Sequence, residues 1–321
     1  MKRFSYPLRS FSWQVPAALA ALWLAFGGVF VAGKIGVTAA PPFLFNGPRF
    51  MIAGVILLGW TVWREKGLRL SWRELLEAAG VGLLIIAAGQ GSAMWGLTSM
   101  PAGLVAVLSA TMPLWLTLLS LLFLHRGIPK LGAVGLVVSF IGACLLASPS
   151  GSGAKALPLV LLMLGMVAWA GGALLASQSK VGRRPLLLSS LQMLFGGAAQ
   201  LGLAFGLGEP VHFHWSTVLT GPVVGAFAFS LFGSSLIGFT AYAWLLRNAP
   251  PTIANSFAYA APVVAIFLSW LILKDPVGPR TMVLAVVVLA GLAVLIWSQG
   301  HTHRLEVPAD VAETEKLSDA A

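Results

Sequence analysis

Ten long runs of apolar residues follow one another along this chain, with short polar stretches between them. The runs cover residues 13–36, 42–63, 75–97, 101–124, 131–148, 156–178, 185–207, 221–246, 251–273 and 280–298. A helix needs about 20 apolar residues to cross the hydrocarbon core of a bilayer. Here 58% of the residues are hydrophobic and 9% are charged, whereas soluble domains have about 25% charged residues. The sequence therefore predicts an all-α integral membrane protein with ten transmembrane helices in a lipid bilayer.

The fourth and ninth runs share one pattern, which indicates an internal repeat. Residues 101–131 read PAGLVAVLSATMPLWLTLLSLLFLHRGIPKL, and residues 250–280 read PPTIANSFAYAAPVVAIFLSWLILKDPVGPR. An offset of 149 residues aligns Pro101 with Pro250 and Pro113 with Pro262. Because each half holds an odd number of spans, the second half would be inserted upside down. We therefore expect 5+5 inverted repeats, an arrangement typical of transporters.

The domain boundaries follow from these runs and from the basic residues. We expect a cytoplasmic N-terminus at 1–12, repeat 1 at 13–148, a linker at 149–155, repeat 2 at 156–298 and a disordered cytoplasmic tail at 299–321. Of the 20 basic residues, 15 fall in segments that would be cytoplasmic if both termini are inside, as the positive-inside rule requires. The first run follows a basic start, so a cleaved signal peptide is the alternative to an uncleaved first helix. The scattered basic residues do not form a face for nucleic acid.

Motifs for enzyme chemistry are missing from the sequence. It has no phosphate-binding glycine loop, no zinc-type histidine pair with glutamate and no serine elbow. His212 and His214 lie near Glu209 in an outer loop, where a solvated loop is favoured over a metal site. All ten Asp and Glu residues lie outside the middles of the runs, so no buried carboxylate is available as a proton relay. We expect no catalytic residue, no metal and no cofactor.

The central prolines mark the expected substrate site. Pro113 and Pro262 lack the N–H that a helix needs at that position, and such helix breaks are tolerated at membrane depth where protein or a water-filled cavity covers them. Six side chains on the same or facing runs are the candidate substrate-binding residues: Trp23, Gln90, Met94, Trp169, Asn255 and Tyr259. Packing between helices and anchoring at the membrane interface are the alternative roles of these residues.

Two basic residues lie inside apolar runs near the predicted outer face. Lys34 and Arg49 are the candidates for a vestibule that pairs with a substrate carboxylate. The alternative is that both side chains extend to the lipid headgroups.

Several segments resemble the drug/metabolite transporter superfamily, in its ten-helix EamA branch. They are PAGLVAVLSATMPLW, the PRFMIAGVILLG run with Arg49 and Phe50, LFGSSLIGFTAYAWLLRN and SFAYAAPVVAIFL. The resemblance covers residues 15–298 and implies a multi-pass protein of the bacterial cytoplasmic (inner) membrane. It also implies the export of amino acids or related metabolites through a cavity lined by the first, third, fourth, sixth, eighth and ninth helices.

Residues and resemblance together predict a transporter that exports a small metabolite, such as an amino acid or a drug-like compound, by alternating access. We expect a small-molecule substrate, no nucleic acid partner, and a monomer or homodimer. The alternatives are a membrane-embedded enzyme acting on a lipid and a non-transporting scaffold subunit. The missing motifs count against the enzyme, and the central prolines count against the scaffold.

Overall fold

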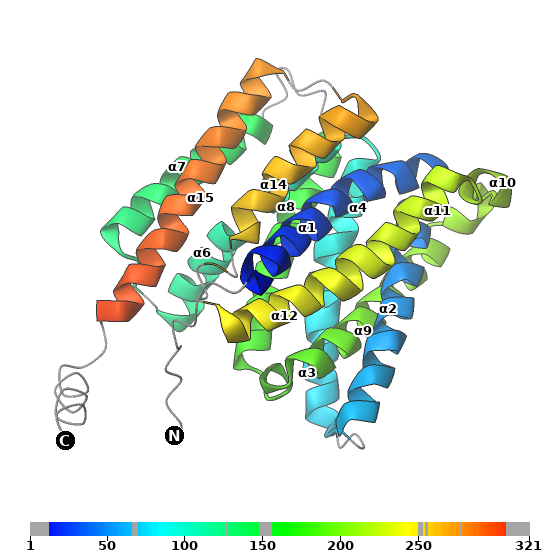
Figure 1. Cartoon of the computed structure of the whole chain (residues 1–321), viewed down its shortest axis with the longest axis horizontal. Helices are drawn as coiled ribbons and strands as arrows, with labels where there is room; N and C mark the ends of the chain where they lie inside the picture. The colour runs from blue at the N-terminus through cyan, green and yellow to red at the C-terminus, as the bar shows by residue number, and fades with distance from the viewer. Residues whose placement is uncertain are drawn as a thin grey trace.

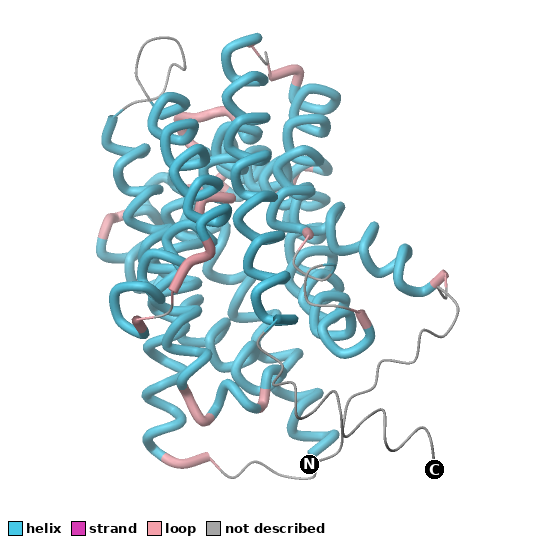
Figure 2. Tube along the Cα trace, turned by 90° about the vertical axis from the view of Figure 1, so that its left-hand side faces the viewer, coloured by secondary structure: helices cyan, strands magenta, loops and turns pink. Residues whose placement is uncertain are grey.

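The computed structural model of the chain describes residues 13–65, 70–125, 127–147, 156–249, 253, 256–275 and 278–305. These residues form helices and the turns between them, without a strand (Figure 2). The predicted N-terminal segment at 1–12, the linker at 149–155 and most of the predicted tail lie outside the described residues.

The first half contains the helical segments α1 (Gln14–Ala39), α2 (Pro42–Glu65), α3 (Trp72–Gly82), η1 (Leu83–Gln90), α4 (Gly91–Leu97), α5 (Ala102–Ser109), α6 (Met112–Leu124) and α7 (Lys130–Ala147). The third run is one continuous rod made of α3, η1 and α4, with η1 in the wider π-helical form. Ser71 caps this rod: its hydroxyl accepts from the Glu74 backbone N–H, and the Glu74 carboxylate accepts from the Ser71 backbone N–H.

The second half contains α8 (Ala156–Gln178), η2 (Val181–Arg183), α9 (Pro185–Gly206), η3 (Glu209–His212), α10 (Trp215–Val218), α11 (Gly221–Ala228), η4 (Phe229–Gly238), α12 (Phe239–Asn248), α14 (Phe257–Leu268), η5 (Ser269–Leu273) and α15 (Pro279–Leu305). The last helix continues past residue 298, the predicted end of repeat 2, and ends at Leu305.

Eight helices among the described residues are long and apolar enough to cross a membrane, judged by length and composition. They correspond to the first four runs, the sixth to eighth runs and the tenth run. The fifth and ninth runs form shorter apolar helices over Lys130–Leu146 and Phe257–Leu273. The chain is therefore an all-helical, multi-pass membrane protein, and the count of ten spans stays a prediction.

Large apolar side chains cover the outward faces of these helices. Leu122 and Phe123 on α6 are exposed, as are Val137 on α7 and Val283 and Val286 on α15. In water such a surface would be an aggregation hazard, but in a bilayer it faces lipid tails of the same polarity. The helices satisfy their own backbone hydrogen bonds, as the hydrocarbon core demands.

Helices of the first half pack against helices of the second half in matching pairs. At one flank α7 lies along α15, and at the other α2 lies along α9 (Figure 1). Between them, α1 packs against α14 and η4, while α8 packs against α6 and η1. The first run of one half thus contacts the third and fourth runs of the other half, in both directions.

Close contacts inside the two flanking pairs show the same reciprocity. The Ser139 hydroxyl on α7 donates to the Val288 carbonyl on α15 at 2.9 Å, between residues 149 positions apart, which is the offset that aligns the prolines. In the other pair, a Cβ added to Gly47 would lie 3.2 Å from the Gly197 carbonyl oxygen. A Cβ added to Gly197 would lie 3.0 Å from the Gly47 carbonyl oxygen. Glycine thus allows the backbones of α2 and α9 to touch.

The ends of the fourth and ninth runs are closed in the same way. His125 and Lys274 are the two described non-glycine residues with positive φ, at 51° and 57°. Their backbone N–H groups donate to the carbonyls of Ser120 and Ser269 respectively. A left-handed residue of this kind commonly terminates a helix.

Candidate functional site

Two π-helical segments interrupt the third and eighth runs in the interior. In η1 the Ile86 carbonyl accepts from the Gly91 backbone N–H and also from Gln200 Nε2 on α9, at 2.7 Å for the side-chain bond. In η4 the Ser235 hydroxyl donates to the Ser230 carbonyl at 3.1 Å. π-helical turns are rare and occur often at functional sites. Polar side chains therefore complete the backbone hydrogen bonding of both segments.

The fourth run is broken close to its central proline. α5 ends at Ser109, and α6 begins at Met112 with Pro113 in its first turn, while the Thr111 hydroxyl donates to the Leu108 carbonyl at 2.6 Å. Every residue from 102 to 111 is buried. α5 packs against α1, α4, α8, α14 and α15, so protein covers the break, as a helix interruption inside a membrane requires.

Pro262 differs from its counterpart. It lies inside α14, which runs from Phe257 to Leu268 as one helix. α14 starts so late in the ninth run that the proline falls in its second turn. The two predicted helix breaks thus take different forms, a two-residue interruption before α6 and a proline within α14.

Predicted site residues of the first and ninth runs lie together. Trp23 Nε1 on α1 donates to the Ser256 hydroxyl at 3.0 Å, and the Ser256 carbonyl accepts from the Tyr259 backbone N–H at 3.2 Å. Trp23 and Tyr259 are half-buried. Asn255, also predicted here, lies outside the described residues.

A second group of predicted residues lies where the third run meets the sixth. Trp169 on α8 packs against Gly89, whose added Cβ would lie 3.0 Å from the Trp169 Cβ. Met94 is 4% exposed and belongs to the same apolar cluster as Trp169. Gln90 is half-buried at the end of η1, next to Gly89. The structure therefore divides the five described residues of the six between two interfaces that each join the halves.

Lys34, predicted for a vestibule, is bound to backbone. Its Nζ donates to the Leu97 carbonyl at 2.6 Å and to the Met100 carbonyl at 3.0 Å. These carbonyls end the rod of the third run, where a cation stabilises the helix dipole. Lys34 thus joins α1 to the end of α4.

Arg49, the other predicted vestibule residue, is buried instead. Its side chain is 2% exposed, and its Nε and Nη1 atoms have no hydrogen-bond partner among the described residues. Its Cζ lies 4.2 Å from the centroid of the Phe50 ring. Asn46, one turn earlier on α2, is 0% exposed, and both of its amide atoms also lack a described partner.

Glu209 holds the start of α2 from the loop after α9. Its carboxylate accepts from the Leu44 backbone N–H at 2.9 Å and from the Phe43 N–H at 3.3 Å. Burial raises the pKa of Glu209 above its ordinary value of 4.5, and the two backbone donors partly oppose that shift. A carboxylate at a helix N-terminus is stabilised by the helix dipole. The predicted outer loop therefore has an acidic residue with a structural contact.

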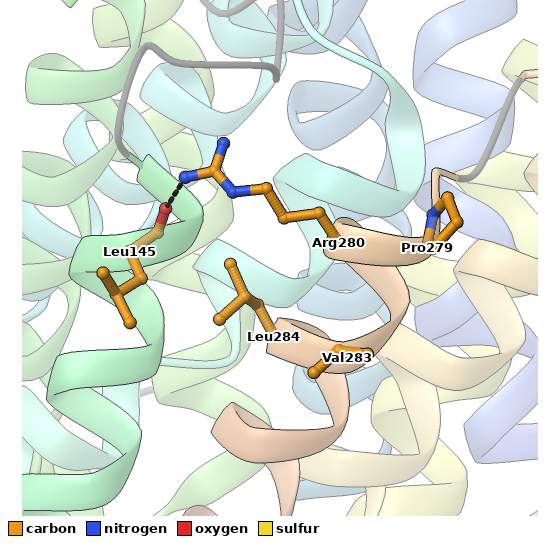
Figure 3. A pocket seen from close by; sticks show the side chains of 5 residues that line it. All are labelled: Leu145, Pro279, Arg280, Val283 and Leu284. Carbon is orange, nitrogen blue, oxygen red and sulfur yellow. Dashed lines mark hydrogen bonds between the residues drawn. The ribbon is translucent and has the colours of Figure 1, made fainter.

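Pockets open at the rim of the molecule. One of about 340 Å³ lies between α7 and α15 and is lined by Leu145, Pro279, Arg280, Val283 and Leu284 (Figure 3). There Arg280 donates to the Leu145 carbonyl at 2.9 Å (Figure 3). Another, of about 320 Å³, lies beside the start of α1 and next to Trp244. No predicted substrate-binding residue lines either pocket.

Comparison with known proteins places these features in a family. A model of the EamA-like transporter family matches residues 15–148 and again residues 156–297. The chain belongs to the EamA-like transporter family. It is therefore a membrane transporter, and its predicted membership of the drug/metabolite transporter superfamily is confirmed.

Relatives of this EamA-like transporter are also named as transporters. The chain is 34% identical to the uncharacterized inner membrane transporter YedA of Escherichia coli over 260 residues, covering 78% of this chain and 80% of YedA. It is 26% identical to the uncharacterized transporter YvbV of Bacillus subtilis, covering 89% and 92% of the two chains. A crystal structure with 18% identity matches 88% of this chain and 98% of its own with a TM-score of 0.57, which concerns the fold alone.

Several buried polar residues were not site candidates in the sequence argument. Among them are Asn46, Gln200, Ser230 and Glu209, the last considered only for a metal. The signal for Asn46 was available, because it lies three positions before Arg49 in an apolar run and so shares its helix face. The others have partners or neighbours far away in the sequence.

Proposed function

We propose that this EamA-like transporter exports small metabolites, such as amino acids or drug-like compounds, across the bacterial inner membrane by alternating access. The inner membrane is the location in the name of YedA. The observation that carries the proposal is that matching interior runs are interrupted where the halves meet: η1 and η4 in the third and eighth runs, and the break before α6 in the fourth.

The arrangement proposed is ten spans in two inverted halves. The eight long apolar helices and the two shorter ones supply the spans. The reciprocal packing of α2 with α9 and of α7 with α15 supports a two-fold relation between the halves. So do the left-handed helix ends at His125 and Lys274. An axis in the membrane plane relates inverted repeats, and substrates bind near it.

The proposed path runs between the two groups of predicted site residues. Trp23 and Tyr259 belong to the interface of the first and ninth runs, and Gln90, Met94 and Trp169 to that of the third and sixth. The buried α5 lies between these interfaces, against α1, α14 and α8. Movement of α5 and α14 relative to each other would open the path on one side.

Transport is tested with purified protein in proteoliposomes. We expect the protein to exchange at least one radiolabelled compound, from a panel of amino acids and aromatic metabolites, faster than liposomes without protein. Exchange no faster than in protein-free liposomes across the panel would contradict the proposal.

Orientation is tested by labelling cysteines from outside intact cells. In a Cys144→Ser background, His212→Cys on η3 should react with a membrane-impermeant maleimide, and Arg73→Cys at the start of α3 should not. Both side chains are exposed in the structure, so accessibility to the reagent depends on the side of the membrane. Labelling of position 73 alone would reverse the proposed cytoplasmic termini.

A further inference from the structure

Two buried polar side chains on α2 have no part in the transport path proposed above. Arg49 and Asn46 lie one turn apart on the same helix face, 2% and 0% exposed. The guanidinium Nε and Nη1 and the amide Nδ2 and Oδ1 all lack a described hydrogen-bond partner. The site lies about 10 Å along α2 from its start at Pro42, at 1.5 Å per residue.

The buried guanidinium of Arg49 would be stabilised by a bound anion. Arginine is effectively always charged, and an unpaired buried charge is strongly unfavourable. No described carboxylate forms an ion pair with Arg49. The Phe50 ring at 4.2 Å gives a cation–π contact, but a ring face leaves the N–H donors without acceptors.

Two other charged residues, Glu209 and Lys34, already have backbone hydrogen-bond partners. The Glu209 carboxylate accepts from the first amides of α2, at Leu44 and Phe43. The Lys34 ammonium donates to carbonyls at the end of α4. Of the two basic residues inside apolar runs, Arg49 is therefore the one with free donors in the described part of the chain.

Further unsatisfied polar atoms lie on the helices that pack against α2. Ser230 on η4 is 0% exposed, and its hydroxyl lacks a described partner. Gln200 on α9 donates through Nε2 to the Ile86 carbonyl, while its Oε1 lacks a described partner. α2 packs against both η4 and α9. Buried polar groups in native proteins nearly always have partners, so this interior is incomplete without a polar ligand or ordered water.

We propose that Arg49 and Asn46 form a binding site for the carboxylate of a transported metabolite. The planar guanidinium presents two parallel donors that match the two oxygens of a carboxylate. Asn46 adds an amide donor, and its Oδ1 accepts from an ammonium or hydroxyl group of the same molecule. The proposal rests on the transport function above and narrows its substrates to compounds with a carboxylate. The site is covered in this conformation, so ligand enters it when the helices around α2 move.

Binding is tested by thermal unfolding of the full-length protein in detergent, with sodium acetate as the probe. Sodium chloride at equal ionic strength is the reference, because salt alone screens charges. A ligand that binds the folded state raises the melting temperature as its concentration passes its dissociation constant. We expect acetate to stabilise the wild type, and Arg49→Gln to weaken the apparent acetate affinity at least tenfold.

Matched variants separate the site from general effects of charge. Arg64→Gln removes the same charge from an exposed position at the other end of α2 and should keep the wild-type acetate response. Arg49→Lys keeps the charge without the two-donor geometry and should bind acetate more weakly than wild type but better than Arg49→Gln. Asn46→Ala, which removes one neutral donor, should weaken acetate affinity about fivefold. These two variants keep the test informative if Arg49→Gln does not fold.

Four results would overturn the site. Acetate could leave the melting temperature of the wild type unchanged, shift it equally in the wild type and Arg49→Gln, or shift it no more than chloride does. The fourth result is stabilisation by phosphatidylglycerol but not by acetate. The last would assign the guanidinium to a lipid phosphate.

The same samples are assayed for exchange in proteoliposomes. Exchange without an acetate response defeats the carboxylate site and leaves the transport function standing. An Arg49-dependent acetate response without exchange supports the site and defeats the transport function.

Discussion

Glu209 illustrates how one side chain outside the membrane spans can position a span. Its carboxylate is the acceptor for the backbone N–H groups of Phe43 and Leu44, the first amides of α2. These amides have no partner inside the helix, so an acceptor there completes the hydrogen bonding of the helix end. Gly208, with φ of 72°, precedes it and turns the chain back toward α2. The loop after α9 thus holds the helix that contains Arg49.

Stability should depend on pH through Glu209. Burial raises the pKa of this carboxyl in the folded state above 4.5, so the folded protein binds more protons than the unfolded chain just above that pH. Stability should therefore fall as pH rises through the interval between the two pKa values. Thermal unfolding from pH 4 to pH 7 should show this decline in the wild type and a flatter profile in Glu209→Gln. Identical profiles would show that the Glu209 carboxyl does not contribute.

The sequence predicts which polar residues lie inside an apolar run and at what depth, but it does not predict their hydrogen-bond partners. Lys34 was placed near the end of its helix, while its acceptors, Leu97 and Met100, are 63 and 66 residues away. In the sequence, Lys34 and Arg49 are equivalent candidates for the vestibule. Their roles diverge because α4 ends beside Lys34 and no described carboxylate comes near Arg49.

At the scale of elements, the ends of the fourth and ninth runs adopt a backbone conformation that suits glycine. His125 and Lys274 have positive φ values of 51° and 57°. L-residues in the left-handed region are strained by about 1 kcal/mol, and glycine is not.

His125→Gly and Lys274→Gly should each stabilise the protein, by up to about 1 kcal/mol, because the relief of strain exceeds the added entropy of the unfolded chain. The control is Leu122→Gly in α6, an exposed helical position, where glycine should destabilise by a similar amount. Thermal unfolding in detergent measures all three. Destabilisation by glycine at 125 and 274 as large as at 122 would contradict the left-handed conformation.

The flanking pair α7 and α15 depends on glycine for its close approach. A Cβ added to Gly291 would lie 2.7 Å from the Gly135 carbonyl oxygen and 2.8 Å from the Ser139 backbone nitrogen. Backbone atoms cannot give way as side chains can, so Gly291→Ala should separate the helices and cost about 1–3 kcal/mol. Gly59→Ala on α2, with nothing within 4 Å of the added Cβ, should be neutral or stabilising. Equal melting temperatures of the two variants would contradict the packing of α7 on α15.

The apolar runs predicted where helices lie, but not their internal form. The π-helical turns of η1 and η4 could not be predicted from the sequence. An added residue in a turn shifts the apolar face of an amphipathic helix, but these runs are apolar on all sides and have no such face. The prolines did signal irregularity, yet the break fell before Pro113, whereas α14 contains Pro262. That difference depends on where each helix begins, which packing decides.

For the whole molecule, the helices of the two predicted halves pack against each other in pairs, α7 with α15 and α2 with α9. The offset of 149 recurs between Ser139 and Val288, which touch across α7 and α15. Sequence alone predicted the helical class and the family, and the division into two inverted halves stays a prediction. The sequence could not say that α5 would be the buried centre, because all of its neighbours except α4 belong to runs distant in the sequence.

Alternating access between the halves is tested most directly by tying α5 to α14. A Cβ added to Gly103 on α5 would lie 3.6 Å from the Ile266 Cβ on α14, within the roughly 3.5–4.5 Å range of disulfides. Gly103→Cys and Ile266→Cys are combined in a Cys144→Ser background, which removes the one native thiol. The account predicts that oxidation abolishes exchange in proteoliposomes and that a reductant restores it, while each single cysteine variant is unaffected by oxidant. Full exchange with the disulfide demonstrably formed would contradict it.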